Sequence, residues 1–552
     1  MEMNKRGGIL SRGVPHSHLY HGRASSLRRF ILNLQCVLAA VFLCGRADGS
    51  APPLEWSRSY NGLANSSDSA YDVCIDRSGN IIVVGKERFN TLGQWDDWMV
   101  RKYDQQGNFL WSRTHNGRYN DNDQALGVDT DLNGNIYVAG FDWNDDCFAD
   151  QDWLIRKYSP NGDLIWSVTY CGTVDDSEQA TSIAVDGGGN VIVVGYEKDA
   201  AVPGTGGNCL VRKYDPGGNL IWSRTYNGFV NYGDSAGDVA IDSSDNIIVG
   251  GFCDYSPANW LLIKYDSSGN ELWTRTYAGL CSGNWGWGGG QIQSVAVDAS
   301  GNILTAGALR GCYNIDYFWL VEKLNSTGNL LWSRTYSCSG ESEGATAVEV
   351  DRNGDVYVAG YHNPTAGFAS MDWIIMKYSA SGEVVWSVTY NSPKADGGDT
   401  PYGIAVIAPD CFLVVGDEDR GDILQASNWL IRKYCSPESG KGGNGHPPGT
   451  GPDPGEVWVS STTGSLPVFP AKGEEFVFRL NAKQPGKLCV RVYGLLWEKI
   501  AVVFEGDIRD GPSEYRWDGR NKNGQVVAAG TYLVRFELPG QKAVIRRIVI
   551  GR

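Results

Sequence analysis

The sequence predicts an all-β protein: a seven-bladed β-propeller closed by its N-terminal strand, with a smaller C-terminal β-sandwich. The first observation is the phrase Trp-Ser-Arg-Thr-Tyr, or a near copy, which occurs seven times. Its first and last Trp are 330 residues apart over six steps, a mean period of 55. The second observation is that turn residues separate short β-prone segments between the copies. The phrase begins at Trp56, Trp111, Trp166, Trp222, Trp273, Trp332 and Trp386.

Three further strand-like segments lie between successive copies of this phrase. Examples are Ala236–Asp242, Gly79–Gly85 and Trp153–Tyr158. The turns between them have a polar start followed by Gly-Asn, as in Asp76–Asn80 and Asp266–Asn270, which is typical of tight hairpins. Four short strands joined by hairpins and repeated at this period indicate propeller blades.

The third observation is the count at the two ends of the repeat region, 52–435. Seven copies of the three-strand unit occur, the last from about Gly403 to Tyr434. Seven copies of the phrase also occur, but the first, Trp56–Tyr60, precedes all the units. We therefore expect the N-terminal strand to complete the last blade, because an open ring would leave strand edges and apolar faces exposed.

A second series of Trp residues supports this register. It recurs in the third strand of six units, with Cys209 in its place once, so the two series hold 13 of the 20 Trp residues. A Trp ladder can stack on sugars, but every copy keeps one register, which favours an apolar core between blades. The second series is Trp98, Trp153, Trp260, Trp319, Trp373 and Trp429.

This repeat resembles the SBBP-type β-propeller repeat of exported bacterial proteins, over residues 55–435. The resemblance implies a fold and almost no chemistry, because that family is a scaffold class.

The remainder of the chain divides into a Gly/Pro-rich linker, 436–455, and a second β-rich region, 456–552. Within it, Trp517-Asp-Gly followed by Gly530-Thr-Tyr532 is similar to the Ig-like domain of the flagellar hook-capping protein FlgD. That resemblance implies an Ig-like sandwich that serves as an attachment or spacer module at the cell surface, without a flagellar role.

Residues 1–47 have the pattern of a secretory signal peptide. A basic stretch precedes the apolar run Phe30–Leu43, and small residues follow it,. The apolar run is shorter than the ~20 residues of a membrane span, so we expect export to the surface or medium and no transmembrane span in the mature chain. Without the leader, 41 basic and 62 acidic residues give a net charge of −21, which disfavours nucleic acid as a partner.

A regularly placed acid is the main candidate for ligand or cation binding. It stands in the loop that enters the inner strand in six of the seven units, with Gly290 as the exception. Clustered carboxylates suit a hard cation such as calcium. The alternative, which we favour, is a cap for loop backbone, and we expect no cofactor. The Asp that opens each first hairpin, as at Asp76, is a turn residue. The six acids are Asp68, Asp123, Glu178, Asp234, Glu343 and Asp399.

Eleven cysteines follow the leader, and eight of them fall into pairs that suit disulfides in an exported protein. Three pairs join the loop after the second strand to the loop after the fourth, and the last pair brackets two antiparallel strands. Buried thiols are the alternative. The pairs are Cys147 with Cys171, Cys253 with Cys281, Cys312 with Cys338, and Cys411 with Cys435.

Catalysis finds little support, since His115 and His362 occupy unrelated blade positions and no catalytic motif is present,. Trp285 and Trp287 in a Gly-rich insertion are suited either to stacking on a sugar or to covering a loop. The sequence therefore predicts a surface scaffold that binds a glycan or a protein. The alternative is a secreted polysaccharide lyase or hydrolase, since two acids on different blades suffice for such chemistry.

Overall fold

The structure, a computed structural model, divides into two compact units with their boundary between residues 443 and 444. The signal-peptide segment and nearly all of the predicted linker lie outside the described residues. The structure describes residues 51–62, 66–88, 95–117, 121–144, 150–172, 177–198, 206–228, 233–253, 259–277, 290–310, 317–337, 343–363, 371–392, 398–419, 427–436, 457–461, 470, 475–494, 499–528, 530–540 and 543–550.

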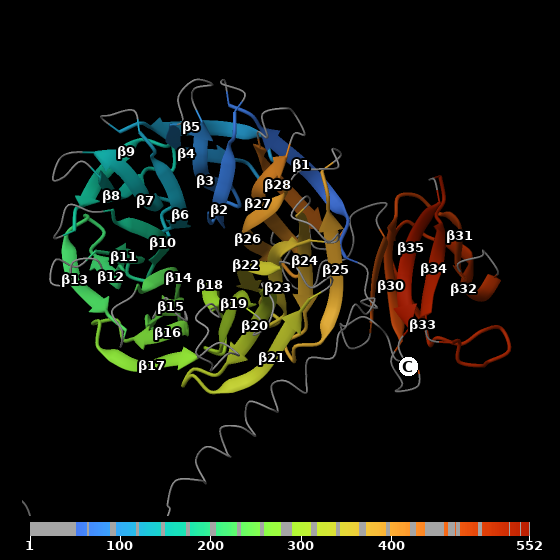
Figure 1. Ribbon diagram of the computed structural model, residues 1–552. Helices are drawn as coiled ribbons and strands as arrows, with labels where there is room; N and C mark the ends of the chain where they lie inside the picture. The colour runs from blue at the N-terminus through green and yellow to red at the C-terminus, as the bar shows by residue number, and fades with distance from the viewer. Residues whose placement is uncertain are drawn as a thin grey trace, which may run out of the picture. The chain divides into compact units, whose positions relative to one another are not determined.

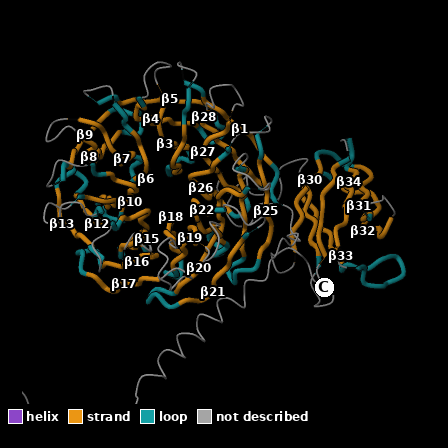
Figure 2. Tube along the Cα trace, in the orientation of Figure 1, coloured by secondary structure: helices purple, strands orange, loops and turns teal. Residues whose placement is uncertain are grey.

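The first unit contains seven four-stranded antiparallel sheets and, in its described residues, no α-helix (Figure 2). Six sheets are formed by consecutive strands. They are β2 (Ser69–Ile75), β3 (Ile81–Arg88), β4 (Asp96–Tyr103), β5 (Phe109–His115); β6 (Gln124–Thr130), β7 (Ile136–Asn144), β8 (Asp150–Tyr158), β9 (Leu164–Tyr170); and β10 (Gln179–Val185), β11 (Val191–Glu197), β12 (Asn208–Tyr214), β13 (Leu220–Tyr226). They continue with β14 (Ser235–Ile241), β15 (Ile247–Cys253), β16 (Asn259–Tyr265), β17 (Glu271–Tyr277); β18 (Gly290–Val297), β19 (Ile303–Arg310), β20 (Tyr317–Leu324), β21 (Leu330–Tyr336); and β22 (Gly344–Val350), β23 (Val356–His362), β24 (Asp372–Tyr378), β25 (Val384–Tyr390).

The seventh sheet combines strands from the two ends of the unit. It consists of β26 (Thr400–Ala408), β27 (Cys411–Asp419), β28 (Ser427–Cys435) and β1 (Leu54–Tyr60), with β1 antiparallel to β28. Tyr60 pairs with Trp429 and Ser57 with Arg432. The first strand of each sheet lies nearest the centre in Figure 1, and each of these strands contacts the first strands of the two neighbouring sheets, with β2 contacting β26. Repeated four-stranded antiparallel sheets in this arrangement are those of a β-propeller.

The sheet-forming residues follow the burial expected for each strand position. The second and third strands are buried on both sides, and β3 begins with a run of Ile and Val, which suits a strand covered on both faces. The fourth strands begin exposed, as Phe109 and Leu110 in β5 show. Between strands, Gly79 has φ of +77°, a conformation that favours Gly, and Asp76 accepts hydrogen bonds from the N–H groups of Ser78 (2.9 Å) and Asn80 (2.8 Å),. The predicted turn role of Asp76 is confirmed.

The third-strand Trp series forms the interlock between sheets. All six Trp residues are at most 1% exposed. Each indole enters the next sheet: Trp319 Nε1 donates to the carbonyl of Tyr361 (3.1 Å), and a Cβ on Gly360 would lie 2.6 Å from the Trp319 ring and collide with the Gly344 carbonyl. The predicted core role is confirmed for this series, and the glycine that accommodates it was not predicted.

The Trp series of the fourth strands is less buried than a core role predicts. Only Trp222 and Trp386 are buried, and the other five are half-exposed. Six of the seven lie against a hairpin glycine of the next sheet, as Trp111 lies against Gly162, whose Cβ would be 3.0 Å from the ring. The seventh, Trp386, stacks on Phe412. The outermost strand has no further strand outside it, so one side of these rings remains near solvent.

The second unit contains two sheets that share one hydrophobic core. Phe476 and Phe478 contribute from one sheet, and Val490 and Phe536 from the other. The sheets are β29 (Val457–Ser461), β30 (Phe476–Ala482), β33 (Gly511–Trp517); and β32 (Lys499–Ile508), β31 (Gly486–Tyr493), β34 (Gly530–Glu537), β35 (Val544–Ile550).

We predict that Gly360→Ala lowers the free energy of unfolding by about 1–3 kcal/mol, because the added methyl collides with backbone and with a fixed indole,. Gly398→Ala is the control, since nothing lies within 4 Å of its Cβ position. Denaturant unfolding measures both. Equal stability of the two variants would contradict the proposed interlock.

Candidate functional site

The six predicted ligand acids lie where each first strand begins, and all are at most 2% exposed. Five of them, all but Glu343, accept hydrogen bonds from backbone N–H groups. Asp68 accepts hydrogen bonds from the N–H groups of Gly62 (2.6 Å) and Arg88 (3.0 Å), and Asp399 accepts from Ser392 (2.7 Å) and Asp419 (2.8 Å).

These bonds connect neighbouring sheets. Gly62 follows β1 of the seventh sheet, whereas Asp68 and Arg88 belong to the first. Asp123 bonds in the same way to Gly117 and Trp143, Glu178 to Gly172, and Asp234 to Gly228. Such contacts are those of the loop-cap alternative, and burial raises the pKa of Asp123 to about 7 and of Asp399 to about 6.

The exception at Gly290 has a steric reason. A Cβ there would lie 2.6 Å from the Ala308 carbonyl oxygen and 2.7 Å from Trp260 Nε1. A carboxylate does not fit in this space.

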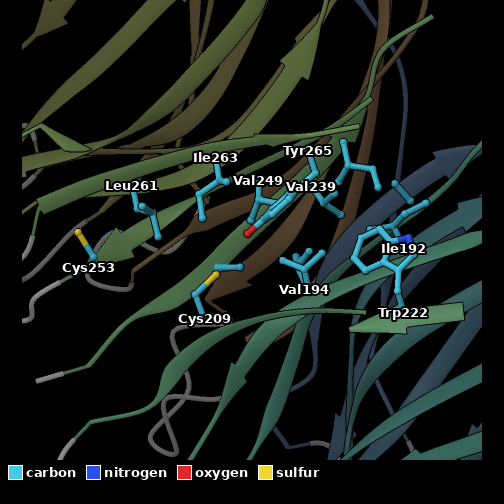
Figure 3. Close-up of a cluster of buried hydrophobic side chains, with 14 residues drawn as sticks. Ile192, Val194, Cys209, Trp222, Val239, Val249, Cys253, Leu261, Ile263 and Tyr265 are labelled. Atoms are coloured by element: carbon cyan, nitrogen blue, oxygen red, sulfur yellow. The ribbon is translucent and has the colours of Figure 1, made fainter. Parts of the chain in front are cut away.

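The predicted cysteine and Trp candidates divide between described and undescribed residues. Cys411 and Cys435 form a disulfide, and Cys171 is also disulfide-bonded. Cys253 is buried in one apolar cluster with Cys209 (Figure 3). Outside the described residues lie Cys147, Cys281, Cys312, Cys338, Trp285 and Trp287.

Among the residues that the structure describes, one set of three His, Cys, Asp or Glu side chains has its ligand atoms within 4.8 Å: Glu55, Cys411 and Cys435. Two of these are joined in the disulfide, which removes the thiolates a metal needs,. The expectation of no cofactor, with calcium as the alternative, remains a prediction.

A second polar constellation was missed by the sequence reasoning. The last residue of a fourth strand meets an acid and an Arg of the next sheet. Tyr170 donates to Glu197 (2.5 Å), and the Arg212 guanidinium lies 3.7 Å from the Tyr170 ring centroid. Tyr390 makes the equivalent contacts with Glu418 (2.7 Å) and Arg432 (3.9 Å).

His115 occupies this Tyr position between the first two sheets. Its Nε2 lies 3.1 Å from Asp142 Oδ2, and Arg156 donates to Nδ1 (3.0 Å). Since Arg only donates, Nδ1 accepts and Nε2 carries the proton. This His therefore replaces a Tyr at a sheet interface, which explains why it matched no His cluster in the sequence.

The first strands of the seven sheets enclose a channel with a volume of about 870 Å³. Four acids line it, and no Lys or Arg is among its lining residues. These acids occupy two different strand positions and occur in only four repeats, so no shared sequence register marks them. The four acids are Asp72, Asp129, Asp238 and Glu349.

The channel acids satisfy N–H groups on the free edges of the inner strands. Asp72 accepts from Val128 of the next sheet (2.8 Å), and Asp129 accepts from Val185 (2.8 Å). Asp238 accepts from Val295 (2.8 Å), as well as from Ser182 Oγ (2.6 Å) and Ser294 Oγ (3.0 Å). These bonds join the first five sheets in succession and hold that part of the channel wall.

Burial sets the charge state of the channel. Burial raises the pKa of Asp72 to about 8. The hydrogen bond from the Val128 N–H lowers this pKa, and the negative charges of Asp238 and Asp129 raise it. Burial likewise raises the pKa of Glu349 to about 7 and of Asp129 to about 6. Burial therefore favours the neutral form of these acids, so the channel is lined by neutral polar groups as well as by carboxylates.

Comparisons with known proteins add little about chemistry. No protein-family model matches the chain. An uncharacterized WD repeat-containing protein of Acanthamoeba polyphaga mimivirus is 30% identical over 122 residues, 19% of this chain and 8% of that protein, so this chain spans a small part of that relative.

Among solved structures, PorZ is described as an essential bacterial surface component of the type-IX secretion system of Porphyromonas gingivalis. It is 14% identical at a TM-score of 0.42, over 89% of this chain and 60% of that chain. A quinohemoprotein alcohol dehydrogenase of Pseudomonas putida is 11% identical at a TM-score of 0.38. The match covers 76% of this chain and 81% of that chain. A Dyadobacter fermentans protein of unknown function is 12% identical at a TM-score of 0.38. The match covers 69% of this chain and 99% of that chain. No helix that could cross a membrane occurs in the part of the chain that the structure describes.

We predict that Asp399→Ala lowers the free energy of unfolding by about 1.5–3 kcal/mol, since it removes the carboxylate that accepts one buried and one half-buried backbone N–H,. Asp215→Ala is the matched control, because Asp215 also accepts two backbone bonds, but these bonds are exposed and Asp215 is only half-buried. Denaturant midpoints distinguish them. A loss no greater than that of the control would argue against the cap.

We also predict that stability falls as pH rises from about 5 to 8. An unfolded Asp releases its proton near pH 4, whereas folded Asp72 retains it to about pH 8, so folding binds protons throughout this window. Thermal midpoints measure the slope, which Asp72→Asn should flatten. Asp104→Asn, at an exposed acid whose side-chain bond from Asn108 lowers its pKa, should leave it unchanged. A midpoint that rises from pH 5 to 8 would refute this.

Proposed function

We propose that this chain is an exported, cell-surface scaffold that binds a glycan or a protein. In this proposal the seven sheets are the blades of a β-propeller that β1 closes, as in SBBP-type repeat proteins. The second unit is an Ig-like sandwich of the FlgD type that attaches or spaces the propeller. The signal-peptide pattern of residues 1–47 supports export. The pairing of β1 with β28 supports a propeller closed by β1.

The channel carries the binding proposal. Its wall is fixed by inter-sheet hydrogen bonds, and its lining offers carboxylates and neutral polar groups without a cation. A recess of this kind suits the hydroxyl groups of a glycan or a basic side chain of a protein. The acids that could otherwise serve in acid–base chemistry accept backbone N–H groups, as Asp72 and Asp399 show.

The test incubates purified residues 48–552 with soluble and insoluble polysaccharides and follows co-sedimentation and new reducing or unsaturated ends together. We expect retention without product. Gln293→Trp, which narrows the channel, should reduce retention, whereas Ala299→Trp in the exposed turn of the same sheet should not. Product formation would favour the lyase or hydrolase, and equal retention by both variants would exclude the channel.

A further inference from the structure

A second recess lies between the first two sheets, at the ends where the short Asp-x-x-Gly-Asn hairpins lie. Its volume is about 440 Å³, within the range of small-ligand pockets. The β2–β3 turn and β5 line one side, and the β6–β7 and β8–β9 turns line the other. Its residues are Asp76, Arg77, Ser78, Asn80, Lys102, Leu110, Trp111, Leu132, Asn133, Gly134, Pro160 and Asn161.

The walls of this hairpin-side pocket are apolar and held in place. Leu110 is 47% and Leu132 58% exposed, so both present aliphatic surface to solvent. Trp111 donates to the Pro160 carbonyl (3.3 Å), and Lys102 donates to the same oxygen (3.1 Å). Lys102 is also paired with Asp76 at 2.9 Å, so these two charges cancel.

The rim of the pocket has unused hydrogen-bonding capacity. Within the described residues, the side chains of Arg77, Ser78, Asn133 and Asn161 have no hydrogen bond or ion pair. Two amides, a hydroxyl and a guanidinium thus lie at the rim above the apolar walls. With the Asp76–Lys102 pair neutral, Arg77 gives the pocket a positive charge on a protein whose net charge is −15.

Three other sheet interfaces differ at the equivalent positions. Gly187 stands at the position of Leu132 in the next turn and supplies no wall. Glu55 pairs with Lys433 (3.3 Å) where the seventh sheet meets the first, and Asp410 pairs with Lys377 (2.9 Å) between the sixth and seventh. At the first interface, aliphatic side chains stand in place of such an acid.

We propose that the hairpin-side pocket binds one pyranose ring of an acidic glycan, a uronic acid unit. The C–H face of a pyranose packs on Leu110, Trp111 and Leu132, while its hydroxyls bond to the Asn133 and Asn161 amides. Arg77 pairs with the sugar carboxylate, for which a guanidinium fork has the matching geometry. This inference rests on the proposed binding function and names a ligand class and a site outside the channel.

The test titrates the full chain with trigalacturonate and, separately, with cellotriose, by calorimetry. We expect trigalacturonate to bind more tightly, and Leu110→Asp to weaken it at least tenfold. Leu331→Asp is the matched control: Leu331 is also the second residue of its strand and 52% exposed, but lies outside this pocket. Arg77→Gln should remove the preference for the acidic sugar. Thermal midpoints verify that each variant is folded.

Four results would overturn the inference. Equal binding by Leu110→Asp and Leu331→Asp would exclude the pocket, and an unchanged preference in Arg77→Gln would exclude the carboxylate contact. Sugar binding lost in Gln293→Trp but kept in Leu110→Asp would assign the glycan to the channel and leave the proposed function intact. If the unmodified chain binds no saccharide but retains a protein ligand, only the present inference fails.

Discussion

The hydrogen bonds between β1 and β28 are the constraint on which the rest of the first unit depends. They place Trp56 and Tyr60 beside the first sheet, where Trp56 lies against Gly107 and Tyr60 lies under the Arg101 guanidinium at 3.7 Å. Six of the seven interfaces between neighbouring sheets have a Trp against a hairpin glycine. A Tyr or His at the end of the fourth strand also meets the next sheet, as His115 and Tyr390 do. Without β1, the contact between the seventh sheet and the first would lack both.

Carboxylates have a structural use in this acidic chain that their number alone would not suggest. Strands at the channel and loops between sheets leave N–H groups without a backbone partner, and an unpaired buried N–H is costly. Asp72, Asp129 and Asp238 satisfy such groups inside the channel, and Asp68 and Asp399 do so at the loops. Acids placed in this way hold neighbouring sheets together, and their raised pKa values follow from burial in those positions.

The sequence was a good guide to features that every repeat shares. The four strands of each unit and their register could be read from recurrence, and the strand count placed Trp56–Tyr60 beside the last unit. The Cys411–Cys435 pair followed from the antiparallel order of the two strands that it brackets. Features confined to some repeats could not. The channel acids occupy two strand positions in four units, and the hairpin-side pocket depends on Leu132, which has no counterpart elsewhere. Comparing repeats emphasises what is common, whereas sites arise where one repeat departs from the others.

The pairing of the first strand with the last also sets an order of events. A ribosome synthesises β1 hundreds of residues before β28. Tyr60 therefore cannot pair with Trp429 until nearly the whole unit has been made. Until then the earliest strand has an unpaired edge, which is a template for pairing with other chains. Its correct partner is as distant in sequence as this unit allows, and contacts so remote form slowly. The last sheet is therefore the latest to assemble and the point at which a nascent chain most needs protection.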